Sequence, residues 1–219
     1  MKKSSLFVYV VLLLCLCAYS QDSSEKLWEI FLKLEATTFA DVNCLSADFS
    51  QQERIAHTQI TREKSGSIKA ERSGRFRMAY REPEPIDILF DGQKLYQHFV
   101  ADNDLQVRAA TERDMAANPF FILFHPERIK ESFYLDSVEK KDNLFVLRLR
   151  ERDEASAIAS LDVQVDMLSG FVTAMTIYGT EGNVTAMTFS NPRIYTCTQG
   201  EFSWQKGEQS PDPGDFFAD

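Results

Sequence analysis

Few residues of this 219-residue chain have the types and spacing that catalytic or metal chemistry requires. His57, His98 and His125 are isolated, with no carboxylate or second histidine at the spacing of metal ligands. Asp87 and Asp91 lie four residues apart beside a predicted turn, and we expect both carboxylates to be solvated rather than catalytic. The motifs of phosphate-binding loops, dinucleotide folds, serine hydrolases and zinc proteases are absent from the sequence. The sequence therefore predicts neither an enzyme nor a metal or cofactor site.

The first twenty residues have the pattern of a secretory signal. Lys2 and Lys3 precede the apolar run from Leu6 to Cys17, and Ala18-Tyr19-Ser20 supplies small residues before a cleavage point. The run of about twelve residues is too short to span a bilayer as a helix. We therefore expect residues 1–20 to be removed after Ser20 and the remainder to be exported.

Cleavage would remove two of the four cysteines and leave Cys44 and Cys197. In an oxidising compartment two cysteines favour a disulfide, and a curled sheet could bring the two ends of a domain together. The alternative is a pair of buried thiols that pack as small apolar groups. Both interpretations stay open at this point.

The charge of the exported part is strongly acidic. Without Lys2 and Lys3 the chain has 22 basic and 33 acidic side chains, a net charge of −11. Such a surface disfavours nucleic acids and anionic membranes. It fits either a plain soluble surface or a partner with a basic surface.

The stretch from Gly66 to Phe99 alternates apolar and polar residues with a period of two, which is typical of strands with one apolar face. The predicted strands are Arg75–Tyr80, Ile86–Asp91 and a third from Lys94, and the turn Asp91-Gly92 separates the last two. This face meets either a plain core or the cavity for a ligand. The candidate cavity residues on these strands and on a preceding one are Phe49, Phe76, Met78, Tyr80, Ile88, Phe90, Leu95 and Phe99.

The rest of the chain predicts one long helix, Gln21–Thr38, and further short strands. The predicted apolar face of that helix contains Leu27, Trp28, Ile30, Phe31 and Leu34. The region Ile60–Ala70 is more polar, and we expect an edge or strongly bent strand there. The other predicted strands are Cys44–Gln52, Leu105–Ala109, Phe133–Glu139, Leu144–Glu151, Leu161–Asp166, Val172–Tyr178, Val184–Phe189 and a last short one at Phe202 and Trp204.

A second, unusual helix is predicted at Asn118-Pro119, because asparagine caps helices and proline suits their first position. The five apolar residues Phe120–Phe124 cannot all pack against one wall, so this helix is expected to plug a hollow. Residues 206–219, rich in acid and proline, are expected to be a loose tail after a single domain at residues 21–205. About eleven short strands with turn signals predict a barrel or part of one.

In their order and spacing these motifs resemble the periplasmic outer-membrane lipoprotein carrier protein LolA family. The resemblance covers about residues 24–204. Its motifs are Arg72 ahead of Gly74-Arg75-Phe76-Arg77, the turn Asp91-Gly92-Gln93-Lys94-Leu95-Tyr96, Asn118-Pro119-Phe120-Phe121, Gly182-Asn183-Val184-Thr185 and Phe189-Ser190-Asn191. Two positions depart from the family pattern: Ser73 replaces a proline, and Phe202-Ser203-Trp204 replaces a terminal motif with two prolines.

The resemblance implies an open, unclosed antiparallel β half-barrel of about eleven strands, covered by the N-terminal helix and short lid helices. By that carry-over, Pro119, Phe120, Phe121, Leu123 and Phe124 form the lid and Arg72 is its latch. The implied function is that of a periplasmic carrier, expected to be a monomer without a cofactor. It would take triacylated lipoproteins from an inner-membrane ABC transporter to an outer-membrane receptor. The alternative is a lipid- or lipoprotein-sensing periplasmic regulator built on the same half-barrel.

Overall fold

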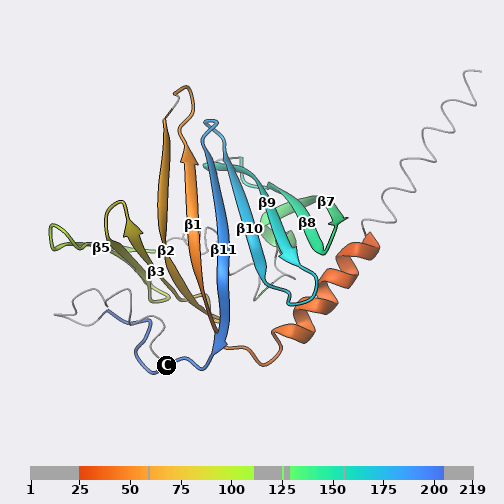
Figure 1. The fold of residues 1–219 in the computed structure, drawn as a ribbon, viewed down its shortest axis with the longest axis horizontal. Coiled ribbons are helices and arrows are strands. Elements are labelled where there is room, and N and C mark those ends of the chain that lie inside the picture. Colours follow the sequence, from red (N-terminus) through yellow and green to blue (C-terminus); the bar gives the residue numbers. More distant parts are fainter. Residues whose placement is uncertain (1–24, 59, 111–124, 126–128, 155, 205–219) are drawn as a thin grey trace, which may run out of the picture.

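Eleven antiparallel strands form one sheet in the computed structural model, which describes residues 25–58, 60–110, 125, 129–154 and 156–204 (Figure 1). This confirms the predicted fold class, a mainly β protein with an unclosed sheet. The strands are β1 (Cys44–Arg54), β2 (Thr61–Glu71), β3 (Phe76–Glu82), β4 (Ile86–Phe90), β5 (Lys94–Phe99), β6 (Asp104–Ala109), β7 (Phe133–Lys141), β8 (Leu144–Glu151), β9 (Ile158–Asp166), β10 (Val172–Gly179) and β11 (Val184–Tyr195).

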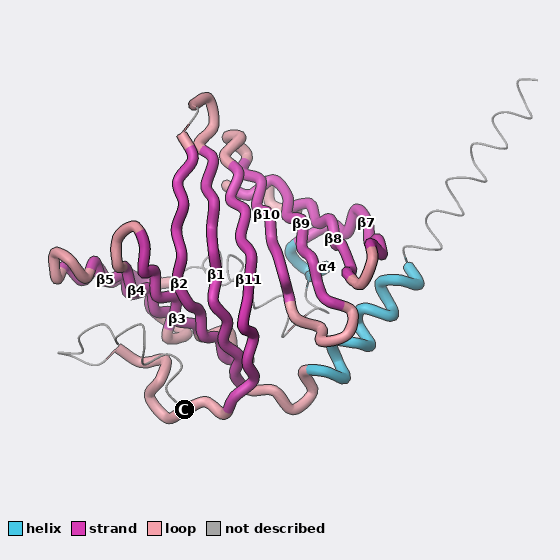
Figure 2. The backbone as a smooth tube through the Cα atoms, in the orientation of Figure 1, coloured by secondary structure: helices cyan, strands magenta, loops and turns pink. Residues whose placement is uncertain are grey.

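The sheet consists of two meanders that meet at one seam. Its order is β6-β5-β4-β3-β2-β1-β11-β10-β9-β8-β7, so strands adjacent in the chain are adjacent in the sheet except where β1 pairs with β11. Figure 2 shows β1, β2 and β11 upright in the middle, with β3–β5 on one side and β7–β10 on the other. Within the described residues β6 and β7 are the two edges, and they do not pair with each other.

The alternation of the sequence sets the register of the central strands. Phe76 is opposite Phe90, Met78 is opposite Ile88, and each pair therefore lies on one face of the sheet. The turn before β5 is fixed by Asp91, whose Oδ1 accepts hydrogen bonds from the backbone N–H groups of Gln93 and Lys94. Gly92 takes a φ of 99°, which glycine adopts without strain.

Of the two alternatives predicted for Ile60–Ala70, an edge strand or a strongly bent strand, the edge strand is wrong, because β2 lies between β1 and β3. β2 pairs with β1 along its whole length, from Thr61 to Glu71, but its pairing with β3 begins only at Ser65. The first residues of β2 therefore extend beyond β3 as a two-stranded ribbon with β1. Their polar character reflects that exposed ribbon.

The helix at residues 25–38 packs on the β7–β11 half of the sheet (Figure 1, lower right). The Phe31 ring meets Phe145 of β8 edge-on at 5.8 Å between centroids, and Phe39, just after the helix, meets Phe171 at 5.4 Å. Ile30 was predicted on the buried face of this helix but is exposed, because it lies off the stripe that contains Trp28 and Phe31. A short helix, α4 (Ile129–Ser132), precedes β7. Neither helix in the described residues has the length and apolar character needed to cross a bilayer.

The C-terminal segment before residue 205 packs on the opposite face of β3–β5. The predicted strand at Phe202 and Trp204 is wrong: residues 201–204 form turns and an irregular end. Phe202 is buried with Leu89, and the Trp204 ring stacks on Tyr96 at 5.8 Å. These two aromatic residues therefore cover the outer side of the sheet instead of adding a strand to it.

This covering explains why the prediction of a solvated Asp87 is wrong. Asp87 is fully buried and accepts hydrogen bonds from Nε and Nη2 of Arg77, the latter at 2.5 Å. A buried carboxylate needs such a partner, because desolvation of an unpaired charge is costly. The pair links β3 to β4 on the outer face of the sheet.

A disulfide joins Cys44, the first residue of β1, to Cys197, with 5.6 Å between the two Cα atoms. The structure thus selects the first of the two alternatives left open by the sequence. The disulfide connects the segment 196–204 to the beginning of β1 across a sequence separation of 153 residues. The predicted signal at residues 1–20, the helix at Asn118–Phe124 and the tail at residues 206–219 lie outside the described residues.

We expect the double substitution Cys44→Ala and Cys197→Ala to lower the free energy of unfolding by about 2–5 kcal/mol, because a crosslink that closes a long loop restricts the unfolded chain. Urea unfolding of residues 21–219 measures this. Dithiothreitol should lower the midpoint of the wild-type chain and leave that of the double variant unchanged. Equal midpoints for the two proteins without reductant would contradict the prediction.

Candidate functional site

The inner face of the β1–β5 meander is largely apolar. One row across the strands contains Phe49, Gly66, Tyr80, Ile86 and Phe99, in that order. Gly66 leaves room for this row, because a Cβ there would lie 2.8 Å from the Phe49 ring and 2.1 Å from the Ala79 carbonyl oxygen. The neighbouring rows bring the other predicted cavity residues onto the same face, namely Phe76, Met78, Ile88, Phe90 and Leu95.

These predicted cavity residues divide by burial into two sets. Phe49, Phe76 and Phe90 are buried within the main core cluster. The other five, Met78, Tyr80, Ile88, Leu95 and Phe99, are only half-buried. The half-buried set has exposed apolar surface, whereas the three buried rings on the same face belong to the core. Their contact with a ligand stays a prediction.

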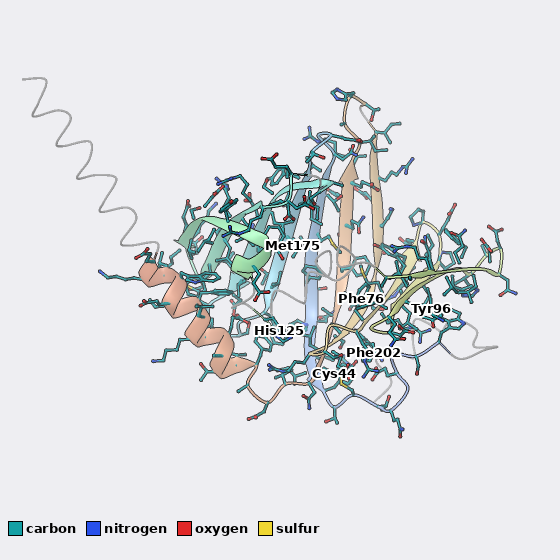
Figure 3. All side chains as sticks on the ribbon, turned by 180° about the vertical axis from the view of Figure 1, so that it is seen from behind. Cys44, Phe76, Tyr96, His125, Met175 and Phe202 are labelled. Carbon is teal, nitrogen blue, oxygen red and sulfur yellow. A yellow bond between two sulfur atoms is a disulfide. The ribbon has the colours of Figure 1, made fainter. Side chains whose placement is uncertain are left out.

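The same face continues across the seam into the β7–β11 meander. No cavity residue was predicted from the sequence in that half. Phe189 of β11 lies opposite Phe49 of β1, and Met187 lies opposite Met175 of β10. Figure 3 shows Phe76 and Met175 on the two halves of this face. The period-two alternation of Val184–Phe189 could have placed Phe189 on the apolar face of its strand. Phe189 is half-buried against the core.

Polar groups mark the end of the inner face nearest the β1–β2 ribbon. The Tyr80 hydroxyl donates a hydrogen bond to Oε1 of Gln51 at 3.2 Å, and the Lys64 ammonium lies 5.9 Å from the centre of the Tyr80 ring. Burial raises the pKa of Tyr80 to about 12, so its phenol stays neutral and remains a donor at physiological pH. The apolar surface of the inner face therefore ends at the Tyr80 hydroxyl, Gln51 and Lys64.

Arg72 lies just after β2 and holds the turn between the helix and β1. Its Nε donates to the Val42 carbonyl at 2.9 Å and its Nη2 donates to the Ala40 carbonyl at 3.5 Å. The backbone N–H of Arg72 also donates to the Asn43 carbonyl at 2.8 Å. The predicted lid residues, Pro119, Phe120, Phe121, Leu123 and Phe124, lie outside the described residues, so the latch role of Arg72 toward them stays a prediction.

His125 connects this turn to the chain that follows the predicted lid. Its Nε2 lies 2.8 Å from the Arg72 carbonyl oxygen, a distance at which the ring nitrogen donates a hydrogen bond. Figure 3 shows His125 toward the middle of the molecule, far along the chain from β2. No local pattern pairs His125 with Arg72, because fifty-three residues separate them.

An open pocket of about 810 Å³ lies beside Arg72, where β2 ends. Arg75 in this pocket binds Glu71 through two hydrogen bonds of 2.6 Å, and that contact lowers the pKa of the Glu71 carboxyl. Glu71 also lies near both sulfur atoms of the disulfide, which offer no thiolate to a metal. Most of the residues that line the pocket are polar or charged, in contrast to those of the inner face; they are Asn43, Glu71, Arg72, Ser73, Arg75, Gly92 and His125.

A buried carboxyl group lies under the helix at residues 25–38. Glu35 is four residues after Phe31, so it belongs to the inward stripe, and its side chain is only 2% exposed. Neither of its oxygens has a hydrogen-bond partner among the residues that the structure describes, and a Cβ added at Gly170 would lie 3.2 Å from Oε1. Desolvation raises the pKa of Glu35 to about 9, so the group is protonated at neutral pH.

We expect Glu35 to make the stability of the protein fall as pH rises. Between the ordinary pKa of about 4.5 and the folded-state pKa of about 9, the folded chain binds more protons than the unfolded chain. The free energy of unfolding should therefore decrease by up to about 1.4 kcal/mol per pH unit in this window. Urea unfolding at several pH values between 5 and 9 measures the slope.

The substitution Glu35→Gln should flatten that slope, because the amide does not titrate. Glu29→Gln is the matched control, since Glu29 is exposed on the same helix and its removal should leave the slope unchanged. A Glu35→Gln variant with the wild-type slope would show that another group causes the pH dependence.

Comparison with known proteins places this architecture in a family. Residues 40–205 match the family model described as "Outer membrane lipoprotein carrier protein LolA". Proteins named outer-membrane lipoprotein carrier protein are 32% identical over 143 residues in Actinobacillus succinogenes and 31% identical over 128 residues in Pasteurella multocida. These matches cover 63% and 57% of this chain but 65% and 58% of the relatives, so the chain spans less than two thirds of each relative's length.

A solved structure supports the fold. An uncharacterized conserved protein from Thermus thermophilus superposes with a TM-score of 0.51 at 11% identity, over 82% of this chain and 94% of that one. The family model covers well over half of the sequence, and its span includes all eleven strands of the sheet. The chain therefore belongs to the outer membrane lipoprotein carrier protein LolA family.

Proposed function

We propose that this protein is a carrier that binds the acyl chains of lipoproteins against the inner face of its sheet. The observation that carries the proposal is the half-buried apolar set Met78, Tyr80, Ile88, Leu95 and Phe99 on one face of an unclosed sheet, in a chain of the LolA family. Its relatives are named for the same task.

The physical need for such a face follows from the cargo. Exposure of an acyl chain to water costs about 0.8 kcal/mol per methylene, so a chain of about 15 methylenes costs about 12 kcal/mol. A carrier has to offset most of this cost with apolar contact. Aromatic and aliphatic side chains on neighbouring strands supply that contact, and the open edges of the sheet leave a route for entry.

A carrier also has to release its cargo, so an empty closed state has to compete with the loaded state. The hydrogen bonds of Arg72 to the Val42 and Ala40 carbonyls are charge-assisted contacts of the kind that can stabilise such a state by a few kcal/mol. They hold the turn between the helix and β1, beside the His125 contact. In this proposal the same arginine also binds the predicted lid when the cavity is empty.

The cell biology of the proposal follows the family resemblance. After cleavage at Ser20 the carrier acts in the periplasm, receives triacylated lipoproteins from an inner-membrane ABC transporter and delivers them to a receptor at the outer membrane. The acidic net charge of the exported chain favours solubility in transit.

We expect the exported chain to bind a synthetic triacylated lipopeptide and not the same peptide without acyl chains. Fluorescence displacement of an acyl probe measures the affinity. The substitution Leu95→Gln should weaken binding about tenfold, because it places an amide in the half-buried apolar face.

Leu168→Gln is the control, since Leu168 is 83% exposed in the turn between β9 and β10 and should have no effect on binding. Equal binding of the unacylated peptide would rule out acyl-chain recognition. If both peptides fail to bind, mass spectrometry of lipids that co-purify from a bacterial host tests the regulator alternative with a different ligand.

We expect Arg72→Leu to bind the lipopeptide but to release it more slowly than the wild type. The loss of the hydrogen bonds to the Val42 and Ala40 carbonyls destabilises the closed state that competes with cargo. Stopped-flow transfer of the lipopeptide to acceptor vesicles measures release, and Arg72→Lys, which retains the charge, should show a smaller change. Wild-type release by Arg72→Leu would argue against the latch.

A further inference from the structure

Gln51 of β1 is a buried polar residue in an otherwise apolar part of the inner face. Its side chain is 8% exposed and lies on the same face as Phe49, two residues before it. Gln51 lies opposite Met187 of β11, which lies opposite Met175 of β10, and both methionines are buried. A leucine or methionine would continue this row without the cost of burying an amide. The amide of Gln51 therefore needs an explanation other than packing.

The Tyr80 hydroxyl sets the direction of this amide. The hydroxyl donates to Oε1 of Gln51 at 3.2 Å, so the Nε2 group points away from the phenol. Nε2 makes no hydrogen bond to another residue in the part of the chain that the structure describes. An amide nitrogen has two N–H donors, so Nε2 can donate to an acceptor from outside the chain.

The aromatic row around Tyr80 holds its hydroxyl in place. The Phe49 ring meets the Tyr80 ring edge-on, with 5.1 Å between the two centroids. Gly66 lies between Phe49 and Tyr80 in the register of the sheet and leaves room for the Phe49 ring. The position of the Gln51 amide thus depends on a phenol that is itself fixed by packing.

Two charged side chains beside the amide pair with each other. Lys64 of β2 lies opposite Gln51, and its ammonium nitrogen is 3.2 Å from a carboxylate oxygen of Glu53. The two side chains are 33% and 30% exposed, so this end of the inner face is open to solvent. Because the ammonium is paired with a carboxylate, this end of the face favours a neutral acceptor over an anion.

The apolar rows and this polar end match the two parts of an ester-linked acyl chain. The half-buried apolar residues of β3–β5 supply contact for the hydrocarbon. An ester carbonyl oxygen is a neutral acceptor, and its transfer from water to an apolar surface is costly unless a donor meets it. The Nε2 group of Gln51 is such a donor, at the point where the apolar surface ends.

We propose that the Gln51 amide binds the ester carbonyl through which an acyl chain is attached to a lipoprotein, and that Tyr80 positions this amide. The assignment rests on the proposed function and names the part of the cargo that the polar end recognises. Acyl chains then bind in one direction. Their linkage lies at the end of the face nearest the β1–β2 ribbon, which is at the top of the view in Figure 2, and their hydrocarbon lies away from it.

Two ligands that differ only in this carbonyl test the proposal. One is a synthetic lipopeptide whose cysteine carries two ester-linked acyl chains on a glyceryl group, and the other is its diether analogue with chains of equal length. Displacement of an acyl probe from residues 21–219 gives both dissociation constants. The wild type should bind the ester about fivefold more tightly, because one net hydrogen bond contributes about this factor.

Equal affinities, or tighter binding of the diether, would overturn the proposal and leave acyl-chain binding intact. If neither ligand binds, the proposed function fails, and the assignment of Gln51 fails with it. The two failures are therefore distinguishable in one experiment.

The substitution Gln51→Leu should bring the two dissociation constants to about the same value, because it removes the donor and retains the apolar row. Gln52→Leu is the matched control. Gln52 is exposed on the opposite face of β1, and its Nε2 donates to Glu63 at 3.1 Å, so its removal should leave the wild-type ratio. A Gln51→Leu variant with the wild-type ratio would show that another group binds the carbonyl and would overturn the proposal.

The substitution Tyr80→Phe tests the positioning role, since it removes the hydroxyl and retains the ring. The preference for the ester over the diether should fall below that of the wild type. A merely structural effect would weaken both ligands alike and leave their ratio unchanged. An unchanged ratio in Tyr80→Phe would overturn the role of the hydroxyl.

Discussion

The structure depends on one constraint: an apolar face of an unclosed sheet has to be shielded from water by something other than the sheet itself. A closed barrel satisfies this with its own opposite wall. Here β6 and β7 remain separate edges, so the shielding comes from added segments. The helix at residues 25–38 covers part of the β7–β11 half, and the half-buried residues of β3–β5 form the surface that we assign to cargo.

The outer face satisfies the same constraint in a different way. The segment that contains Phe202 and Trp204 lies over β3–β5, on the same face as the buried ion pair of Arg77 with Asp87. The disulfide fixes this segment to β1, so the outer covering is covalent and permanent. The inner face has no comparable crosslink in the described residues. The two faces of one sheet therefore differ in the property that a carrier needs, which is reversible access.

Much of this arrangement could be predicted from the sequence, because a period of two determines which side chains share a face. The cavity residues on β3, β4 and β5 came from that rule, and the register places them together. Asp87 also followed the alternation, but its burial depends on Phe202 and Trp204, more than a hundred residues away. Local patterns contain no information on such coverage, and for the same reason the contact of His125 with Arg72 was missed. The burial of Glu35 was missed although its spacing from Phe31 places it on the inward stripe of the helix.

The seam between β1 and β11 has a consequence for the order in which the protein is made. β2 follows β1 directly in the chain, so this pair needs only a local contact, but the other neighbour of β1 begins only at Val184. One edge of the first meander thus stays open throughout translation of the second, during which it is exposed to wrong partners. Contacts of this sequence separation form slowly, and Cys197 emerges later still. Completion of the sheet and its covalent closure are therefore late events, which require nearly the whole chain.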